Sequence, residues 1–157
     1  MIVVQIAQKM GINITAVVSA KGVDLAKKWG ATQVINYQNQ SVQGLTDQFD
    51  AILDLSGKLP FEMARPLLTA NGLFVNTTPT LKDIILTPIA NLMRRQKVKL
   101  LMSSPDQGTL QILSQYANQG LDVYIGQSFD WLDFENAYAQ IKQKGSLGKA
   151  VLTIRGA

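Results

Sequence analysis

The chain has 157 residues, a formal net charge of +4 and 46% hydrophobic residues, which is the composition of one folded domain and not of a disordered chain. It contains neither cysteine nor histidine, which excludes disulfides, Cys- or His-liganded zinc, thiol nucleophiles and histidine acid–base catalysis within this chain. No apolar run is long enough to cross a membrane and the first residues lack signal-peptide features, so we expect a cytoplasmic protein without a membrane partner.

Helical and strand patterns alternate along the sequence. In chain order we expect a helix at 2–9, a strand at 14–18, a helix at 24–29, a strand at 33–37, a loop with a weak helix to 47, a strand at 49–55, a helix at 60–68 and, after an Asn71-Gly72 turn, a strand at 72–76. A helix follows at 82–94 that Pro88 must bend or restart, then a strand at 98–102, a helix at 106–118, a strand at 123–129, a helix capped by Asp133 with Phe134, Ala137, Tyr138 and Ile141 facing inward, and a strand at 150–154. Apolar strands alternating with helices predict an α/β fold with a parallel, doubly wound sheet covered on both faces.

In open parallel sheets, ligands bind at the carboxyl ends of the strands. That rule selects residues at or just after the carboxyl ends of four of the predicted strands as candidates for a binding site. They are Ser19, Lys21, Tyr37, Leu55, Ser56, Gly57, Asn76, Thr77 and Thr78.

Six segments in register resemble the cofactor half of medium-chain dehydrogenases/reductases, and the quinone oxidoreductase-like, zinc-independent branch above all. The segments lie at 16–21, 29–37, 49–54, 72–75, 98–102 and 145–152, so the resemblance covers nearly the whole chain. It implies a Rossmann-like domain over residues 1–121, and a strand–helix–strand extension over 122–157 that in the family returns to the catalytic domain. It also implies a nicotinamide dinucleotide as the cofactor.

The sequence departs from this family at its start. Family members carry a catalytic domain, a first strand and a glycine-rich turn ahead of the first helix, whereas the resemblance places Met1 of this chain inside that helix. Because that strand lies at the middle of the sheet, the strands at 14–18 and 51–54 would lose ladder partners. We therefore expect a locally rearranged sheet or a homo-oligomer, such as a dimer, that joins exposed strand edges, with 98–102 as the family's dimer edge.

The end of the second family strand favours NADPH over NADH. NAD binders place an acidic residue there, but this chain has Ser19, which can bond a phosphate oxygen, and Lys21, which supplies a positive charge. Tyr37 can donate its phenol to the same group. The alternative is that Ser19 and Lys21 form a solvated turn and that Tyr37 packs at a strand end.

The two later loops have similar alternatives. Gly57 permits a close backbone approach beside the ribose and pyrophosphate, and Asn76, Thr77 and Thr78 follow a strand near the nicotinamide. Residues 55–57 can equally form a plain strand-to-helix turn, and 77–79 a stiff turn. Asp54 is interpreted as a cap or turn acceptor and not as half of a hydrolytic carboxylate pair with Asp50.

No catalytic residue and no metal ligand is predicted, and the scattered lysines and arginines argue against a nucleic-acid partner. The resemblance implies that an intact relative transfers hydride from NADPH to a quinone or enone. Whether this chain is itself an enzyme is left open, since it is expected to bind NADP weakly or not at all. The alternatives are a non-catalytic module that associates with itself and an inactive structural remnant.

Overall fold

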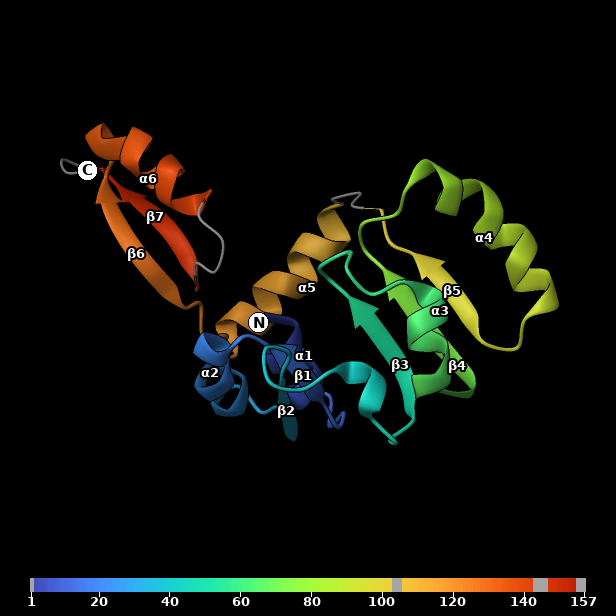
Figure 1. The fold of residues 1–157 in the computed structure, drawn as a ribbon. Coiled ribbons are helices and arrows are strands. Elements are labelled where there is room, and N and C mark those ends of the chain that lie inside the picture. Colours follow the sequence, from blue (N-terminus) through green and yellow to red (C-terminus); the bar gives the residue numbers. More distant parts are fainter. Residues whose placement is uncertain (1, 103–105, 143–146, 155–157) are drawn as a thin grey trace. The chain divides into compact units, whose positions relative to one another are not determined.

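The computed structural model of the chain describes residues 2–102, 106–142 and 147–154, and it has the predicted α/β architecture with parallel strand pairing (Figure 1). The described strands form three sheets: β1 (Thr15–Val18) with β2 (Gln33–Asn36), then β3 (Phe49–Asp54), β4 (Leu68–Asn76) and β5 (Lys97–Leu100), and finally β6 (Ile125–Asp130) with β7 (Lys149–Thr153). The chain divides into two compact units, residues 1–40 with 107–157 and residues 41–106. Each unit is described by itself.

The first unit begins with two helix–strand repeats. Helix α1 (Ile2–Lys9) leads into β1, and a short 3-10 turn, η1 (Ala20–Gly22), with helix α2 (Val23–Lys28) connects β1 to β2. Helices α1 and α2 are neighbours, because a side chain at Gly30, just after α2, would run into Gln8 of α1. Gly30 has a φ of 95°, a left-handed conformation that glycine adopts without strain. Its small size therefore lets the two helices pack closely.

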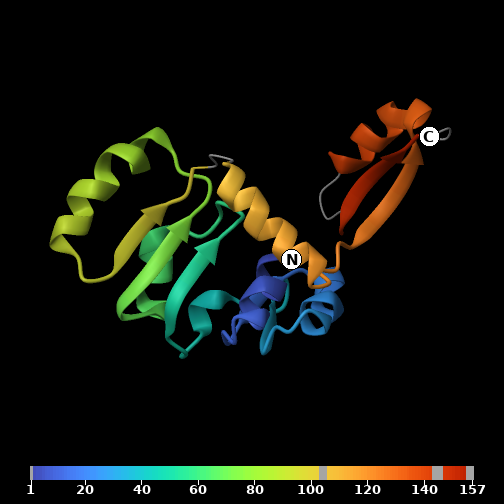
Figure 2. The same ribbon diagram turned by 180° about the vertical axis from the view of Figure 1, so that it is seen from behind.

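The same unit contains helix α5 (Gln107–Asn118) and a strand–helix–strand segment in which the 3-10 turn η4 (Trp131–Asp133) and helix α6 (Phe134–Ile141) connect β6 to β7 (Figure 2). The predicted helix and both strands are confirmed to within two residues. The predicted burial is wrong for Phe134, Tyr138 and Ile141, which are exposed, while Ala137 is 2% exposed. A two-stranded sheet is narrow, so it buries only the residue at the centre of the helix face, Ala137, and leaves the larger side chains on either side exposed.

Asp133 also differs from its predicted role. It precedes α6 but makes no side-chain cap; its carboxylate instead accepts a hydrogen bond from Asn136 Nδ2 at 2.6 Å. Asp130 caps the preceding turn by accepting from the backbone N–H of Leu132 at 3.1 Å. The capping function is thus present one turn earlier than the sequence predicts.

The second unit holds the three-stranded sheet and its helices, α3 (Phe61–Ala64) with the 3-10 turn η3 (Arg65–Leu67), and α4 (Leu81–Met93). Its core consists of Ala64, Leu68 and Phe74, which are almost fully buried. Phe61 packs against Phe74 with ring centroids 5.8 Å apart, and the Arg94 guanidinium lies 4.9 Å from the Phe61 ring centre. Burial of these rings ties α3 to the sheet.

Three predicted elements of this unit differ from the structure. The weak helix expected to reach residue 47 is only a 3-10 turn, η2 (Val42–Gly44). The turn expected at Asn71-Gly72 lies within β4, where the pairing with β3 shifts its register between Phe49 and Ala51. Helix α4 continues through Pro88 without the restart that was one of the two expected outcomes, and it begins with a complete capping box at Thr80 and Asp83; a bend at Pro88 stays a prediction.

Among the described strands, none pairs with the second edge of β1 or of β3. The rearranged sheet or homo-oligomer expected from the sequence stays a prediction. The outer edge of β5 is different, because the Asn91 side chain of α4 occupies it. Asn91 Nδ2 donates to the carbonyl of Val98 at 2.8 Å, and Asn91 Oδ1 accepts from the Val98 N–H at 3.0 Å. Dimerisation through this edge, the sequence-based expectation, remains a prediction and would require Asn91 to move.

Among the described residues, no helix has the length and apolar character that a membrane span requires.

Candidate functional site

The first candidate cluster lies at the carboxyl ends of β1 and β2, which the parallel pairing brings to one edge. The Tyr37 N–H donates to the carbonyl of Val18 at 3.1 Å, so the tyrosine directly follows the last pair of the ladder. Ser19 follows β1 at the position before η1, and Lys21 lies within that turn. The structure therefore places Ser19, Lys21 and Tyr37 at one end of the same two-stranded sheet.

The side chains of this cluster are available to a ligand. Tyr37 is 57% exposed and Lys21 is also exposed, and residues 18–21 contain no carboxylate. One further residue, which the sequence did not single out, fixes the turn: Gln38 Oε1 accepts from the backbone N–H of Ala20 at 2.9 Å. No motif marks this glutamine, because its role depends on the spatial neighbourhood of β1 and β2.

The second candidate cluster, in the other unit, is organised by the buried carboxylate of Asp54 at the end of β3. Asp54 Oδ1 accepts from the N–H and the hydroxyl of Ser56, each at 2.8 Å, and from the N–H of Gly57 at 3.0 Å. Asp54 Oδ2 accepts from the N–H of Leu59 at 3.1 Å. Burial raises the pKa of Asp54, but these hydrogen bonds to the charged form outweigh it, and the pKa is lowered from its ordinary value.

The loop after β4 meets this carboxylate loop. Both the N–H and the hydroxyl of Thr77 donate to the backbone carbonyl of Asp54, at 3.2 and 2.9 Å. Asn76 Oδ1 accepts from the N–H of Thr78 at 2.9 Å. Gly57 has a φ of 67°, and a Cβ at this position would collide with the Thr78 hydroxyl. The structure thus brings Ser56 and Gly57 against Thr77 and Thr78, with Leu55 exposed beside them.

The interpretation of Asp54 as a turn acceptor is confirmed by these bonds. A hydrolytic pair with Asp50 is not supported, because both Asp54 oxygens already accept hydrogen bonds from the loop. Asp50 is exposed and accepts a hydrogen bond from the Thr69 hydroxyl at 3.3 Å. Asp54 therefore shapes a loop and does not act as a base.

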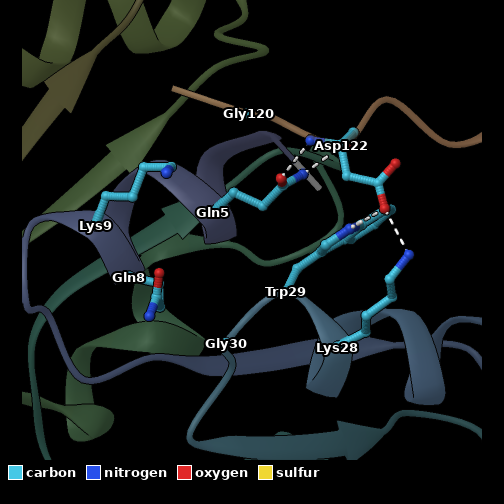
Figure 3. Close-up of a pocket in the computed structure, with 8 residues that line it drawn as sticks. All are labelled: Gln5, Gln8, Lys9, Lys28, Trp29, Gly30, Gly120 and Asp122. Atoms are coloured by element: carbon cyan, nitrogen blue, oxygen red, sulfur yellow. Dashed lines mark hydrogen bonds and ion pairs between the residues drawn. The ribbon is translucent and has the colours of Figure 1, made fainter. Parts of the chain in front are cut away.

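A polar hollow of about 300 Å³ lies within the first unit, between α1, the end of α2 and the segment that precedes β6 (Figure 3). Gln5, 6% exposed, donates from Nε2 to the carbonyl of Asp122 at 2.8 Å and accepts from its N–H at 2.7 Å. The Asp122 carboxylate accepts from Lys28 Nζ at 2.7 Å and from the Trp29 indole at 3.1 Å. These two hydrogen bonds and the Lys28 charge lower the pKa of Asp122.

None of these four side chains was predicted from the sequence, because Gln5 and Asp122 are 117 positions apart and no local pattern links them. Their bonds join three separate segments of the chain. We interpret them as a structural junction and not as a ligand site, since every polar group named already has a protein partner.

Replacing Gln5 with alanine is expected to lower the free energy of unfolding by about 2 kcal/mol, because two hydrogen bonds to the Asp122 backbone are lost together. Urea denaturation of both proteins measures the difference. Gln8→Ala is the matched control, since Gln8 is an exposed glutamine on the same helix and its removal should change the stability by less than about 0.5 kcal/mol. Equal losses in the two variants would contradict the role given to Gln5.

The parallel strands, their helical connections and the polar loops at the strands' carboxyl ends define an α/β fold of the Rossmann type. The chain belongs to the zinc-binding dehydrogenase family, whose model matches residues 29–152.

Among curated proteins, the chain is 23% identical over 155 residues to the chloroplastic quinone oxidoreductase QR1 of Triphysaria versicolor, covering 95% of this chain and 47% of that protein. Two solved quinone oxidoreductases share the fold. That of Coxiella burnetii has a TM-score of 0.79 with 20% identity, over 97% of this chain and 48% of that one. That of Escherichia coli, solved with NADPH, has a TM-score of 0.68 with 20% identity, over 97% of this chain and 53% of that one. The chain spans about half the length of these relatives.

The metal in the family's name does not fit the residues of this chain. Zinc sites are built mainly from cysteine and histidine, with acidic side chains as supplementary ligands. The sequence has no cysteine or histidine, and the part of it that the structure describes contains no group of three acidic side chains placed to hold a metal. No chemical step is therefore assigned to zinc.

Proposed function

We propose that the chain is an NADP-binding domain of a quinone or enone oxidoreductase. The observation that carries this proposal is the edge formed by the ends of β1 and β2, where a serine and an exposed lysine follow β1, an exposed tyrosine follows β2, and residues 18–21 contain no carboxylate. The NADPH in the solved Escherichia coli relative supports the choice of cofactor. A bound dinucleotide would supply the hydride for the reaction.

In this proposal, the cluster of the first unit binds the phosphorylated ribose of adenosine. Ser19 donates a hydrogen bond to a phosphate oxygen, Lys21 adds a positive charge, and Tyr37 donates its phenol hydroxyl. The missing carboxylate matters because an acidic side chain there would repel a 2′-phosphate and favour the free hydroxyl of NAD. Exposure of Lys21 and Tyr37 keeps both polar ends accessible.

The cluster of the second unit serves the nicotinamide side of the cofactor in the same proposal. The loop at Leu55, Ser56 and Gly57 is held rigid by Asp54, and the loop at Asn76, Thr77 and Thr78 is bonded against it. Such pre-formed loops can offer backbone groups to a ligand without being ordered on binding. We further propose that residues 1–121 form the nucleotide-binding part and residues 122–157 the segment that adjoins a catalytic domain.

We propose that this chain by itself binds the cofactor weakly and does not catalyse hydride transfer to a substrate. It has no histidine or cysteine to move a proton, and the buried carboxylate of Asp54 already accepts hydrogen bonds from the loop that follows it. Isothermal titration of the purified chain with NADPH and with NADH tests the proposal. Micromolar affinity for NADPH with much weaker affinity for NADH supports it, whereas undetectable binding of both supports the alternative of a structural remnant.

Replacing Lys21 with alanine is expected to raise the dissociation constant for NADPH about fivefold, which corresponds to about 1 kcal/mol, and to leave that for NADH unchanged. The reason is that Lys21 is expected to contact only the 2′-phosphate. Lys27→Ala is the control, because Lys27 is an exposed lysine on the nearby helix α2 and outside the cluster. An equal loss of affinity for the two cofactors, or in the two variants, would count against the assignment of Lys21.

A further inference from the structure

Helix α4, which lies beside β5 at the edge of its sheet (Figure 1), presents its large apolar side chains to solvent. None of its 13 residues is buried. Leu92 is 86% exposed, Met93 is 89% exposed and Ile85 is 67% exposed. A continuous apolar surface of this kind on a folded protein marks a place where a partner binds.

The two faces of α4 are the reverse of what a helix packed on a sheet normally has, which is an apolar face toward the core and a polar face toward water. Small and polar residues at positions 83, 87, 90 and 91 share one face, and this face is half-buried. Asn91 bonds from it to the N–H and the carbonyl of Val98 in β5. The opposite face is exposed and carries Leu81, Ile85, Ile89 and Leu92. The protein therefore packs against the polar face of α4 and leaves the apolar face unused.

Basic residues accompany the apolar face at both of its ends. Between positions 80 and 100 the sequence has five lysines and arginines, at 82, 94, 95, 97 and 99, and a single acidic residue, Asp83. The Asp83 carboxylate belongs to the half-buried face and accepts from the N–H and the hydroxyl of Thr80, each at 2.8 Å. Lys82 lies at the start of the exposed face, and Arg95 follows the end of the helix; both are exposed. The apolar face thus has positive charge at either end.

This distribution of charge indicates the class of partner. A second copy of the chain would bring positive charges together whether the two helices ran parallel or antiparallel, because both ends of the face are basic. A helix of 13 residues is also too short to cross a membrane, which requires about 20. An apolar face accompanied by lysine and arginine is instead the pattern of a helix that lies in the plane of a membrane surface. Its apolar side chains enter the acyl boundary while its cations meet anionic headgroups.

We propose that α4 binds the surface of a bilayer that contains anionic phospholipids. Ile85 and Leu92 enter the boundary between headgroups and acyl chains, and Lys82 lays its alkyl stem along the apolar face while its ammonium group reaches a lipid phosphate. The sequence-based expectation of no membrane partner rests on the lack of a spanning segment, and a helix lying in the surface needs none. The contact involves neither candidate cluster and does not depend on the proposed cofactor.

Sedimentation of the whole chain with vesicles tests this proposal. The vesicles are phosphatidylcholine mixed with phosphatidylglycerol, or phosphatidylcholine alone, and no nucleotide is added. The chain should bind the neutral vesicles at least about tenfold more weakly than the anionic ones, and added salt should weaken the anionic binding because the charges are then screened.

Two variants locate the contact on α4. Ile85→Gln combined with Leu92→Gln removes two outward apolar side chains and keeps good helix formers, so it should weaken binding to anionic vesicles by at least about tenfold and leave the circular dichroism unchanged. Leu110→Gln combined with Ile112→Gln is the matched control, because these are two exposed aliphatic residues of another helix, α5. The control should bind like the original chain.

A fluorescent label reports the depth of the helix directly. Because the sequence has no cysteine, Leu92→Cys can carry one polarity-sensitive fluorophore, and Ile112→Cys can carry the same label on α5. Emission from position 92 should shift to shorter wavelength on anionic vesicles, and emission from position 112 should not. No binding to anionic vesicles, equal weakening in the two glutamine variants, or an unshifted label at position 92 on the bound chain would each overturn the proposal. A dimer seen by sedimentation velocity without lipid, and abolished by the α4 variant, would overturn it as well, because the occupant would then be a second copy.

Discussion

Replacing Asp54 with alanine is expected to lower the free energy of unfolding by about 3 kcal/mol, measured by urea denaturation at neutral pH. Its carboxylate is 6% exposed and accepts four hydrogen bonds from residues 56–59, so the substitution leaves three part-buried backbone N–H groups and the Ser56 hydroxyl without this acceptor. The neighbouring loop is affected as well, because Thr77 bonds to the carbonyl of the same residue.

Asp54→Asn separates charge from shape. The asparagine keeps one oxygen acceptor, but its amide NH₂ must face either the N–H of Leu59 or those of Ser56 and Gly57, and we expect it to lose nearly as much stability as alanine. Asp50→Asn is the matched control on the same strand. Asp50 is exposed, so its substitution should change stability by less than about 0.5 kcal/mol. Similar losses in both variants would show that strand charge, and not the loop, is responsible.

The effect of Asp54 depends on pH in a defined direction. Because its folded-state pKa lies below the ordinary value of 3.8, its contribution is complete above that value and disappears as the pH falls through the lower, folded-state pKa. The stabilities of the original chain and of Asp54→Ala should therefore differ most at neutral pH and approach each other in strong acid. A difference that stays constant through the acid range would contradict the role of the charged form.

Local patterns in the sequence were sufficient for most elements of the fold. Apolar strands, helical spacing and glycines such as Gly11, Gly30 and Gly120, all at positive φ, predicted the alternation of α1 to β7. The shift of pairing in β4 was not predictable, because a bulge within a paired strand and a turn both use Asn-Gly. The exposure of Phe134 and Tyr138 was also not predictable, since periodicity gives the apolar face of a helix and not the size of the surface that covers it.

The candidate sites, like the fold, have features that local sequence patterns predict and features that they do not. The rule that ligands bind at the carboxyl ends of parallel strands selected Ser19, Tyr37, Gly57 and Thr78 from the sequence. In the structure Ser19 and Tyr37 directly follow a strand, and Gly57 and Thr78 lie in the loops after β3 and β4. The contacts that hold these loops are long-range. Gln38 bonds to Ala20, and Gln5 to Asp122, across sequence separations that no spacing rule detects. The structure therefore adds to the sequence analysis the polar side chains that form hydrogen bonds with backbone groups far away in the sequence.

Replacing Gly57 with alanine is expected to cost about 2 to 3 kcal/mol of stability, from two separable causes. The φ of 67° disfavours any residue with a Cβ by about 1 to 2 kcal/mol. In addition, the new methyl would collide with the Thr78 hydroxyl and lie 3.3 Å from its Cβ. The loop after β3 and the loop after β4 would therefore have to separate, which disturbs both parts of the proposed nicotinamide-side cluster.

A double-mutant cycle with Thr78→Ala distinguishes these two causes. Alanine at position 78 removes the hydroxyl that collides and leaves a close contact of 3.3 Å to its Cβ, which a small shift of the loop relieves. In that background Gly57→Ala should therefore cost little more than its backbone part of about 1 to 2 kcal/mol. Urea denaturation of the four proteins gives the coupling energy, and NADPH titration of each shows whether affinity follows loop geometry. A coupling energy of zero would mean that the loops are not in contact in solution, since a steric conflict between two residues disappears when either side is removed.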